Sequence, residues 1–417
     1  MLKKLLLIVL FFGACTISAQ STIKTMFYNI LQFPEAQQGD NRELILRDII
    51  EAYQPDIFMV CELQSAVGAT EILDNSLNVN GNQYSAVPFV SNQSGSGDLQ
   101  QLLFYRSNMF TLENTDIITT FVRDINRYVL KLNTANGQSD PVLLDIYVTH
   151  LKSSQGGDNV ALRLDMVNEF TSTLPDLDPN SYIIFAGDLN IYTSTEPAYI
   201  ELLDPTNAIT LVDPIDRPGA WNNNINFQDV HTQSTRTSSG PFGAGAGGGL
   251  DDRFDFILVS ENMLSDPKMK YVKNSYKAYG NNGNCFNESI NDVGCSGEFS
   301  QELRDDLYVM SDHLPVVMEL ETNEEIVILS GTEFEANRVK VEMENTMVED
   351  NLRLIFPSNY EKGFDLVVYN TLGQELSRTR ILPGVESQTI DVSALSSGVY
   401  TLTNTAWPSN PVKFLKK

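Results

Sequence analysis

Six short apolar segments constrain the fold of this chain more than any other feature of its sequence. Each is rich in β-branched or aromatic residues, and together they span residues 56–61, 102–105, 143–149, 182–186, 254–259 and 315–320. Short runs of this composition are typical of buried strands. Between them, apolar residues recur with helical spacing at 41–53 and 158–174. Strands interleaved with helices predict an α/β sheet whose faces are covered.

The composition excludes several classes of protein. With 42% hydrophobic and 20% charged residues, the chain is not fibrous, disordered or a polytopic membrane protein. A formal net charge of −26 argues against a protein that holds nucleic acid through a basic surface. An enzyme that reaches a phosphodiester through a bound metal remains compatible with this charge. The 417 residues allow more than one domain, at roughly 100–200 residues each.

The N-terminal residues indicate export. Lys3 and Lys4 precede an apolar run at 5–12, and small residues then lead to Ala19. This order is typical of a secretory signal peptide, here residues 1–19 with cleavage after Ala19. The run is much shorter than the ~20 apolar residues of a membrane span, so we expect no integral membrane segment after cleavage. Cys15 leaves a lipid-anchored lipoprotein as the less favoured alternative.

Two of the cysteines predict a disulfide. Cys285 and Cys295 lie in a polar stretch with nine residues between them. In an exported protein such a pair is expected to form a bond that closes a surface loop. Cys61 follows an apolar segment and is expected to be a buried thiol of the core.

Polar residues stand where the predicted strands begin or end. Ligand sites of α/β sheets form where strand ends converge, so these side chains are candidates for one pocket. Any one of them alone has an ordinary structural explanation, such as a turn residue, a solvated strand end or a structural ion pair. As a set, they indicate a functional site. The candidates are Asn29, Glu62, His150, Asp188, Asn190, Asp255, Asp312 and His313.

The residue types in this set point to one class of chemistry. The oxygen ligands Glu62, Asp312 and Asn29 suit Mg²⁺ or Mn²⁺, with Ca²⁺ as a structural alternative, rather than zinc. A further carboxylate can orient or deprotonate water, and histidines and amides can donate to phosphate oxygens. This inventory predicts metal-assisted hydrolysis of a phosphate ester. Motifs of serine hydrolases, zinc proteases and P-loop enzymes do not occur in the sequence.

The candidate residues lie in motifs that resemble a known family. Over residues 20–322, the segments 28–30, 60–64, 149–153, 187–190, 253–257 and 311–315 are similar, in this order, to the endonuclease/exonuclease/phosphatase superfamily, which has the DNase I-like fold. The resemblance implies a four-layer α/β sandwich. It also implies Mg²⁺-dependent hydrolysis of phosphodiesters or phosphomonoesters at a site between two central sheets.

The resemblance assigns roles at the metal and water side of the site. Asn29, Glu62 and Asp312 match metal-site positions of the family. Asp188 matches the residue that orients or deprotonates the water. Asn190 matches a residue that contacts the phosphate.

On the phosphate side, His313 matches the histidine at the scissile phosphate, and Asp255 matches the carboxylate that holds it. Whether the aspartate that handles the water or this histidine takes the proton stays open. His150 matches the branch that contains DNase I, sphingomyelinases and inositol phosphatases. Arg127 resembles a phosphate-contacting arginine of the DNase I branch.

Two further segments precede the 254–259 strand. Residues 229–236 and the glycine-rich stretch 240–249 are expected beside the pocket, the latter as a mobile loop. His231 is interpreted as a surface histidine, with a role in substrate choice as the alternative.

The C-terminal part of the chain has a different sequence pattern. Short strands with turns are predicted at 366–369, 388–392 and 399–403, which indicates a small all-β module. Segments 368–375, 390–395, 397–400 and 413–417 resemble a type IX secretion C-terminal sorting domain, assigned to residues 340–417 after a linker at 323–339. The resemblance implies interaction with the secretion machinery, export to the cell surface or beyond, and removal of the tail.

These features lead to a functional hypothesis with two alternatives. The preferred hypothesis is an extracellular nuclease that hydrolyses DNA or RNA, with nucleic acid as substrate rather than as a stable partner. One alternative is a sphingomyelin or phospholipid phosphodiesterase, or a phosphatase, of the same fold. The other is a non-catalytic cell-surface protein. Net charge does not choose between them, since −26 repels both DNA and anionic membranes.

Overall fold

The computed structural model describes residues 21–35, 41–81, 83–95, 97–239, 243–328, 341–356, 363–371, 373–382, 384–385, 387–404 and 407–417. The predicted signal peptide, most of the predicted linker and residues 240–242 of the glycine-rich stretch lie outside these ranges. Among the described residues, no helix is both long and apolar enough to cross a membrane.

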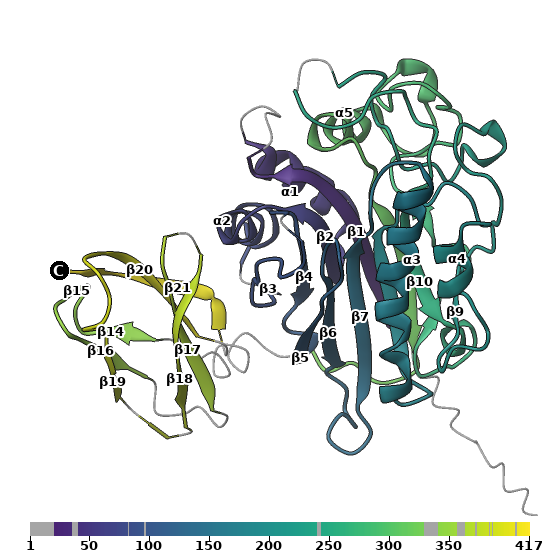
Figure 1. Cartoon of the computed structure of the whole chain (residues 1–417). Coiled ribbons are helices and arrows are strands. Elements are labelled where there is room, and N and C mark those ends of the chain that lie inside the picture. The colour runs from purple at the N-terminus through teal and green to yellow at the C-terminus, as the bar shows by residue number, and fades with distance from the viewer. Residues whose placement is uncertain are drawn as a thin grey trace, which may run out of the picture.

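Residues 21–328 form two mixed sheets that pack face to face (Figure 1). The first sheet has the order β11 (Lys270–Tyr271), β13 (Val316–Thr322), β1 (Ser21–Phe33), β2 (Ile57–Leu63), β4 (Gln100–Arg106), β3 (Tyr84–Ala86), with β12 (Lys277–Ala278) also on β13. The second has the order β5 (Phe110–Ile118), β6 (Ile125–Leu132), β7 (Val142–His150), β8 (Tyr182–Asp188), β10 (Asp255–Ser260), β9 (Leu211–Val212).

Helices cover the outer face of each sheet. On the first sheet, α1 (Arg42–Tyr53) and α5 (Gln301–Met310) bury their apolar sides in the main core, and the short α2 (Ala66–Glu71) follows β2. On the second sheet, α3 (Gly157–Thr171) and α4 (Pro197–Leu202) pack in a separate core against β7, β8 and β10. The succession helix, sheet, sheet, helix is the predicted four-layer α/β sandwich.

Each of the six predicted strands and both predicted helices is present, shifted by at most a few residues. The prediction missed most of β1, the β5–β6 hairpin and α5. β5 is exposed over much of its length, so its residues do not form the apolar run that marks a buried strand.

Sheet topology brings the strand ends to one edge. β1 runs parallel to β2, and β7 runs parallel to β8, with His150 opposite Asp188. β10 is antiparallel to β8 and begins at Asp255, which also pairs with Asp188. β13 is antiparallel to β1 and begins just after His313. The carboxyl ends of four strands and the amino ends of two others therefore meet at the same edge of the sandwich.

The first unit extends beyond the predicted boundary at residue 322. Val327 N donates to Asn133 O at 2.8 Å, and Ala135 N donates to Glu325 O at 3.0 Å. Thr134 and Ile326 also form an isolated bridge. The described part of this unit therefore runs to residue 328.

The C-terminal residues form two small sheets with a core of their own. One has the order β14 (Glu342–Met343), β16 (Asn351–Ile355), β19 (Ser387–Asp391), and the other β15 (Met347–Val348), β21 (Trp407–Lys416), β20 (Gly398–Asn404), β17 (Phe364–Tyr369), β18 (Glu375–Ile381). Apolar residues of both sheets, Leu352 and Leu402 among them, share one buried cluster. This is the predicted all-β module, and three of its strands lie where the sequence indicates them.

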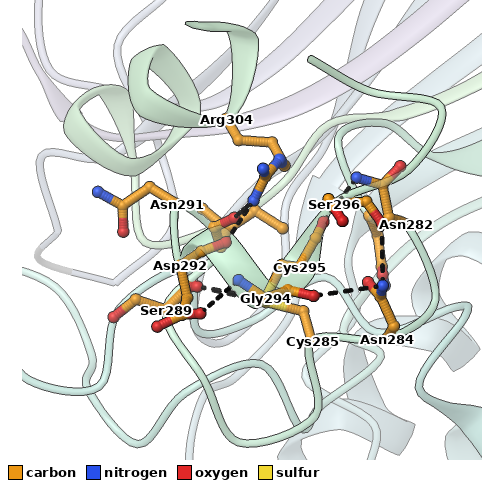
Figure 2. Close-up of a disulfide and its surroundings, with 12 residues drawn as sticks. Asn282, Asn284, Cys285, Ser289, Asn291, Asp292, Gly294, Cys295, Ser296 and Arg304 are labelled. Atoms are coloured by element: carbon orange, nitrogen blue, oxygen red, sulfur yellow. Dashed lines mark hydrogen bonds between the residues drawn. A yellow bond between two sulfur atoms is a disulfide. The ribbon is translucent and has the colours of Figure 1, made fainter. Parts of the chain in front are cut away.

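Cys285 and Cys295 are joined by the predicted disulfide (Figure 2). The polar loop around the bond is held by side-chain amides and by Arg304 of α5, whose Nη1 donates to Ile290 O at 2.8 Å and to Asp292 O at 2.7 Å. Ile290 N in turn donates to Thr235 O at 2.9 Å. The loop thus supports the segment that runs past the strand-end edge.

We predict that the double variant Cys285→Ser, Cys295→Ser unfolds at a lower urea concentration than the native chain. Loss of a native disulfide typically costs about 2–5 kcal/mol, because the unfolded chain gains conformational freedom. Dithiothreitol should lower the stability of the native chain and leave that of the double variant unchanged. Equal sensitivity of both proteins to the reductant would contradict a stabilising bond.

Candidate active site

The strand-end edge gathers all eight candidate residues that the motifs predict. β1, β2, β7, β8 and β10 each contribute one side chain, and the loops after β8 and before β13 contribute the rest. All of these residues are buried except Glu62, whose side chain is 12% exposed and forms the open side of the cluster. The set is Asn29, Glu62, His150, Asp188, Asn190, Asp255, Asp312 and His313.

Asn29 links two of the carboxylates. Its amide nitrogen donates to Glu62 Oε1 at 3.0 Å and to Asp188 Oδ2 at 3.1 Å. Its amide oxygen accepts from Leu31 N at 3.0 Å, and Gln32 N donates to Glu62 Oε2 at 3.1 Å. Asn29 therefore orients the two carboxylates, and these contacts do not support its predicted role as a metal ligand.

His313 and Asp255 form a buried pair, with His313 Nδ1 at 2.7 Å from Asp255 Oδ2. The other ring nitrogen, Nε2, lies 3.7 Å from Asp188 Oδ2. The side-chain amide of Gln233 contacts the same Nε2 at 2.6 Å and Asp312 Oδ2 at 3.2 Å. The imidazole is thus held at both nitrogens and faces the carboxylate cluster.

His150 approaches the same carboxylate oxygen as His313. Its Nε2 lies 3.5 Å from Asp188 Oδ2, and its Nδ1 lies 3.9 Å from Glu62 Oε1. Asn190 N donates to Asp188 Oδ1 at 3.1 Å, and the Asn190 amide donates to Leu151 O at 3.4 Å. Asp188 is therefore approached from both oxygens and lies at the centre of the site.

The backbone is strained at two of these positions. Glu62 has φ of 62° and Asn190 has φ of 51°, so both occupy the left-handed region that non-glycine residues rarely adopt. Such positions cost of order 1–3 kcal/mol each and cluster at functional sites. Gly187 is required beside Asp188, because a Cβ there would lie 2.5 Å from Thr149 O. The surrounding structure therefore holds the backbone of Glu62 and Asn190 in a conformation that these residues rarely adopt.

Burial governs the ionisation of the carboxylates. Desolvation raises the pKa of Asp188 well above its ordinary value; nearby His313 opposes this rise, and Asp255 and Glu62 reinforce it. Burial also raises the pKa of Glu62, with a further contribution from Asp312. Both carboxylates therefore bind protons more readily than exposed carboxylates do, and a nearby cation favours their ionised forms.

The two histidines are driven to opposite states. Burial lowers the pKa of His150 well below its ordinary value, and the Arg123 guanidinium lowers it further. Burial alone would also lower the pKa of His313, but nearby carboxylates, chiefly Asp255 and Asp188, raise it well above the ordinary value. The surroundings therefore disfavour the charged form of His150 and favour the charged form of His313.

The residues present fit a hard divalent cation. Ligand atoms of Glu62, His150 and Asp188 lie within 4.8 Å of one another, as do those of Asp188, Asp255 and His313. Asp312 Oδ1 is buried and accepts no hydrogen bond from any residue that the structure describes. Clustered carboxylate oxygens with an unsatisfied acceptor are the donor set that Mg²⁺ or Mn²⁺ prefers.

Two predictions about individual residues are wrong. Arg127 faces the second helical layer: it pairs in register with Tyr147 of the core under α3, and its Nε donates to Asp145 Oδ1 at 2.9 Å. It lies on the face of the sheet opposite to His150, so it is not at the candidate site. His231 is fully buried, with Nε2 at 2.9 Å from Trp221 O, and is a structural rather than a surface histidine.

The prediction missed Arg123 and did not single out Gln233. Arg123 lies in the β5–β6 turn, and its Nη1 donates to His150 O at 3.3 Å and Leu151 O at 3.1 Å. Polar residues at strand ends are the signal that could have identified Arg123, because β6 begins at the edge where β7 ends, but the sequence analysis does not recognise β6 as a strand. Gln233 belongs to the segment 229–236 that the sequence places beside the pocket, although no motif marks this residue individually.

The described part of the glycine-rich stretch lies against Asp312. Ala246 N donates to Asp312 Oδ2 at 2.6 Å. Gly245 has φ of 87°, and a Cβ at this position would meet the Asp312 side chain at 3.0 Å. Glycine thus permits the close approach that fixes this carboxylate.

Comparison with family models identifies the C-terminal module. Residues 348–413 match the model described as secretion system C-terminal sorting domain. The tail is a secretion sorting domain. This match confirms the predicted export to the cell surface or beyond.

Comparison with curated proteins finds no relative of the chain. Solved structures that resemble it include the human Nocturnin catalytic domain with bound sulfate, at 18% identity, 72% of this chain, 93% of that chain and a TM-score of 0.45. Another is an endonuclease/exonuclease/phosphatase family protein from Bacteroides thetaiotaomicron, at 15% identity, covering 73% of this chain and 96% of that chain with a TM-score of 0.46. A third is D. rerio TDP2 complexed with single strand DNA product, at 15% identity, covering 72% of this chain and 100% of that chain with a TM-score of 0.46. These TM-scores lie below 0.5, so the four-layer α/β sandwich rests on the sheet topology described above and not on these matches.

The paired His313 and Asp255 generate a pH prediction. Replacing Asp255 by Asn removes the carboxylate that contributes most to raising the His313 pKa, so the imidazolium should lose its proton at lower pH. If activity needs the protonated ring, the alkaline limb of kcat/KM should move to lower pH in Asp255→Asn. Asp266→Asn, at the other end of β8 where it contacts Tyr182, is the control and should not move that limb. An alkaline limb unchanged by Asp255→Asn would exclude His313 as the titrating group.

Proposed function

We propose that this chain is an exported, divalent-metal-dependent phosphodiesterase that acts on nucleic acid. The observation that carries the proposal is the convergence of Glu62, Asp188, Asp255 and Asp312 with His150 and His313 at one edge of the sheets. Three of these four carboxylates are buried, Glu62 is nearly so, and none forms an Arg or Lys ion pair among the described residues, which stability alone explains poorly.

The chain's own residues divide the work of hydrolysis. Asp188, whose two oxygens are fixed by Asn29 and by Asn190 N, orients the attacking water and accepts its proton as the new P–O bond forms. The ester P–O bond breaks and the alcohol leaves. His313, whose charged form nearby carboxylates favour, donates to a phosphate oxygen as negative charge develops, with Asp255 fixing the ring. Asn190 and His150 flank Asp188 and contribute polar contacts to the phosphate.

Glu62 and Asp188, with the unpaired oxygen of Asp312, are the groups that would hold the cation. A divalent ion bound there supplies Lewis-acid neutralisation of phosphate charge. Asn29 keeps the Glu62 and Asp188 carboxylates aligned for this purpose.

We predict that EDTA abolishes hydrolysis and that Mg²⁺ or Mn²⁺ restores it. One preparation should be offered plasmid DNA, RNA, sphingomyelin, phosphatidylcholine and bis-p-nitrophenyl phosphate, with the His313→Ala protein as the blank. Loss of a positioned acid or base typically lowers the rate by ~10²–10⁴-fold, so that variant should be nearly inactive while still folded.

Each alternative has its own outcome in the same assay. Cleavage of a lipid without cleavage of plasmid or RNA would contradict the nuclease hypothesis and support a lipid phosphodiesterase. No hydrolysis of any substrate with either metal would favour a non-catalytic surface protein. Full activity in EDTA would contradict the proposed dependence of hydrolysis on a divalent metal.

The separate core of the C-terminal module generates a further prediction. We propose that residues 340–417 serve sorting alone, because their apolar cluster contains no residue of the first unit. Deleting them should leave the purified enzyme with its full kcat/KM and retain it in the periplasm of its host. A deletion variant that folds, judged by circular dichroism, yet has lost activity would show that the module belongs to the catalytic unit.

A further inference from the structure

A pocket of about 930 Å³ opens beside the candidate site, and none of the eight site residues lines it. Its walls come from residues 93–95 and 97, the β5–β6 turn at 119–123, and Lys152 with Leu162. Its volume falls in the range of ~300–1,000 Å³ that is usual for ligand pockets. Arg123 connects it to the site, because this residue lines the pocket and also bonds the carbonyls of His150 and Leu151.

The pocket carries positive charge in a strongly acidic chain. Arg123 and Lys152 both line it, and among the described residues neither forms an ion pair with a carboxylate. Arg123 donates to main-chain carbonyls, and Lys152 Nζ donates to Ser153 O at 2.9 Å. Burial lowers the pKa of Lys152, and the neighbouring Arg123 and Arg163 lower it further. Cations held close together without acidic partners, in a chain of net charge −26, form an anion site.

An exposed aromatic ring stands at the rim of the same pocket. Phe121 lines it and is 73% exposed, although it belongs to the tight turn between β5 and β6. Exposing a large ring costs solvation free energy, so a ring beside two cations favours a ligand with a planar group next to a negative charge. A nucleotide has that combination, since its base stacks on aromatic rings and its phosphate pairs with cations.

The pocket walls are fixed by buried contacts. Asp124 is buried and accepts from Ser94 Oγ at 2.5 Å and Gln93 N at 2.6 Å, which ties residues 93 and 94 to the β5–β6 turn. Gly95 permits this approach, because a Cβ there would lie 2.6 Å from Val122 O.

The wall that carries Lys152 is fixed in the same way. Arg163 of α3 is fully buried, pairs with Glu196, and donates to Lys152 O at 2.8 Å and Ser154 O at 2.9 Å. Buried hydrogen bonds therefore hold both walls of the pocket in place.

We propose that this pocket is a subsite for the nucleotide adjacent to the scissile phosphate of an unpaired strand. The neighbouring phosphate lies against Arg123 and Lys152, and the base stacks on Phe121. An unpaired base is required, because in a duplex both faces of the base are already stacked. The inference deepens the proposed function, since it rests on a phosphodiester held at the Asp188 and His313 site.

The test measures binding separately from hydrolysis. The full chain carrying His313→Ala, with Mg²⁺, is titrated with a short fluorescent single-stranded oligonucleotide, and with the same sequence as a duplex, by anisotropy. Adding Phe121→Ala or Lys152→Gln should weaken single-strand binding by ~5–100-fold, the size expected for one stacked base or one phosphate contact. Duplex binding should change much less with Phe121→Ala.

Matched controls separate the subsite from general surface effects. Ile200→Ala removes an exposed apolar side chain from α4, and Lys131→Gln removes a partly exposed cation from β6; neither lines the pocket. Both variants should bind the single strand with the same affinity as the full chain that carries His313→Ala alone. Lys152→Gln should also lower the slope of log affinity against log salt by about one, whereas Phe121→Ala should leave that slope unchanged.

The outcomes distinguish this inference from the proposed function. The subsite is overturned if the parent does not bind the single strand, if Phe121→Ala leaves that binding unchanged, or if Phe121→Ala weakens attachment to sphingomyelin vesicles instead. Absence of hydrolysis of every substrate named above by the native chain, with Mg²⁺ or Mn²⁺, would overturn the proposed function, and the binding measurement would still decide the subsite.

Discussion

The concentration of negative charge around Asp188 is the constraint on which the rest of the site depends. Buried carboxylates close to one another are costly unless protons, donors or cations compensate them. The structure supplies partial compensation through the Asn29 amide, backbone N–H groups and the His313 imidazolium. What these groups leave uncompensated is what a divalent cation would neutralise, so metal affinity and histidine protonation have one electrostatic cause.

Placing those charges together is a property of sheet topology. The parallel pairs β1–β2 and β7–β8 deliver their carboxyl ends to one edge, and the antiparallel neighbours β10 and β13 begin there. The two sheets pack face to face, so residues far apart in sequence meet at their common edge. Glu62 and Asn190 adopt the left-handed backbone conformation at this edge, at a cost that the packed sheets offset.

The sequence predicts the fold and most of the site because both depend on local patterns. Buried strands are apolar, and chemically active residues follow them, so Glu62, His150 and Asp188 are recognisable without coordinates. Arg127 was misassigned because alternation along a strand decides its face, and β6 was not recognised as a strand. The burial of His231 depends on the distant Trp221 carbonyl, and no local pattern shows such a contact.

The contrast between the acidic chain and the cationic pocket has a consequence for substrate selection. Long-range repulsion from a chain of net charge −26 is screened beyond about 8–10 Å at physiological salt, so direct contacts count for more than the overall charge. If nucleic acid is the substrate, as proposed, Arg123 and Lys152 are cations of the pocket without a carboxylate partner among the described residues and would contact its phosphates there. Such a strand would lie close to His150, because Arg123 bonds the His150 carbonyl. The proposed subsite and the proposed hydrolytic site would then act on the same strand.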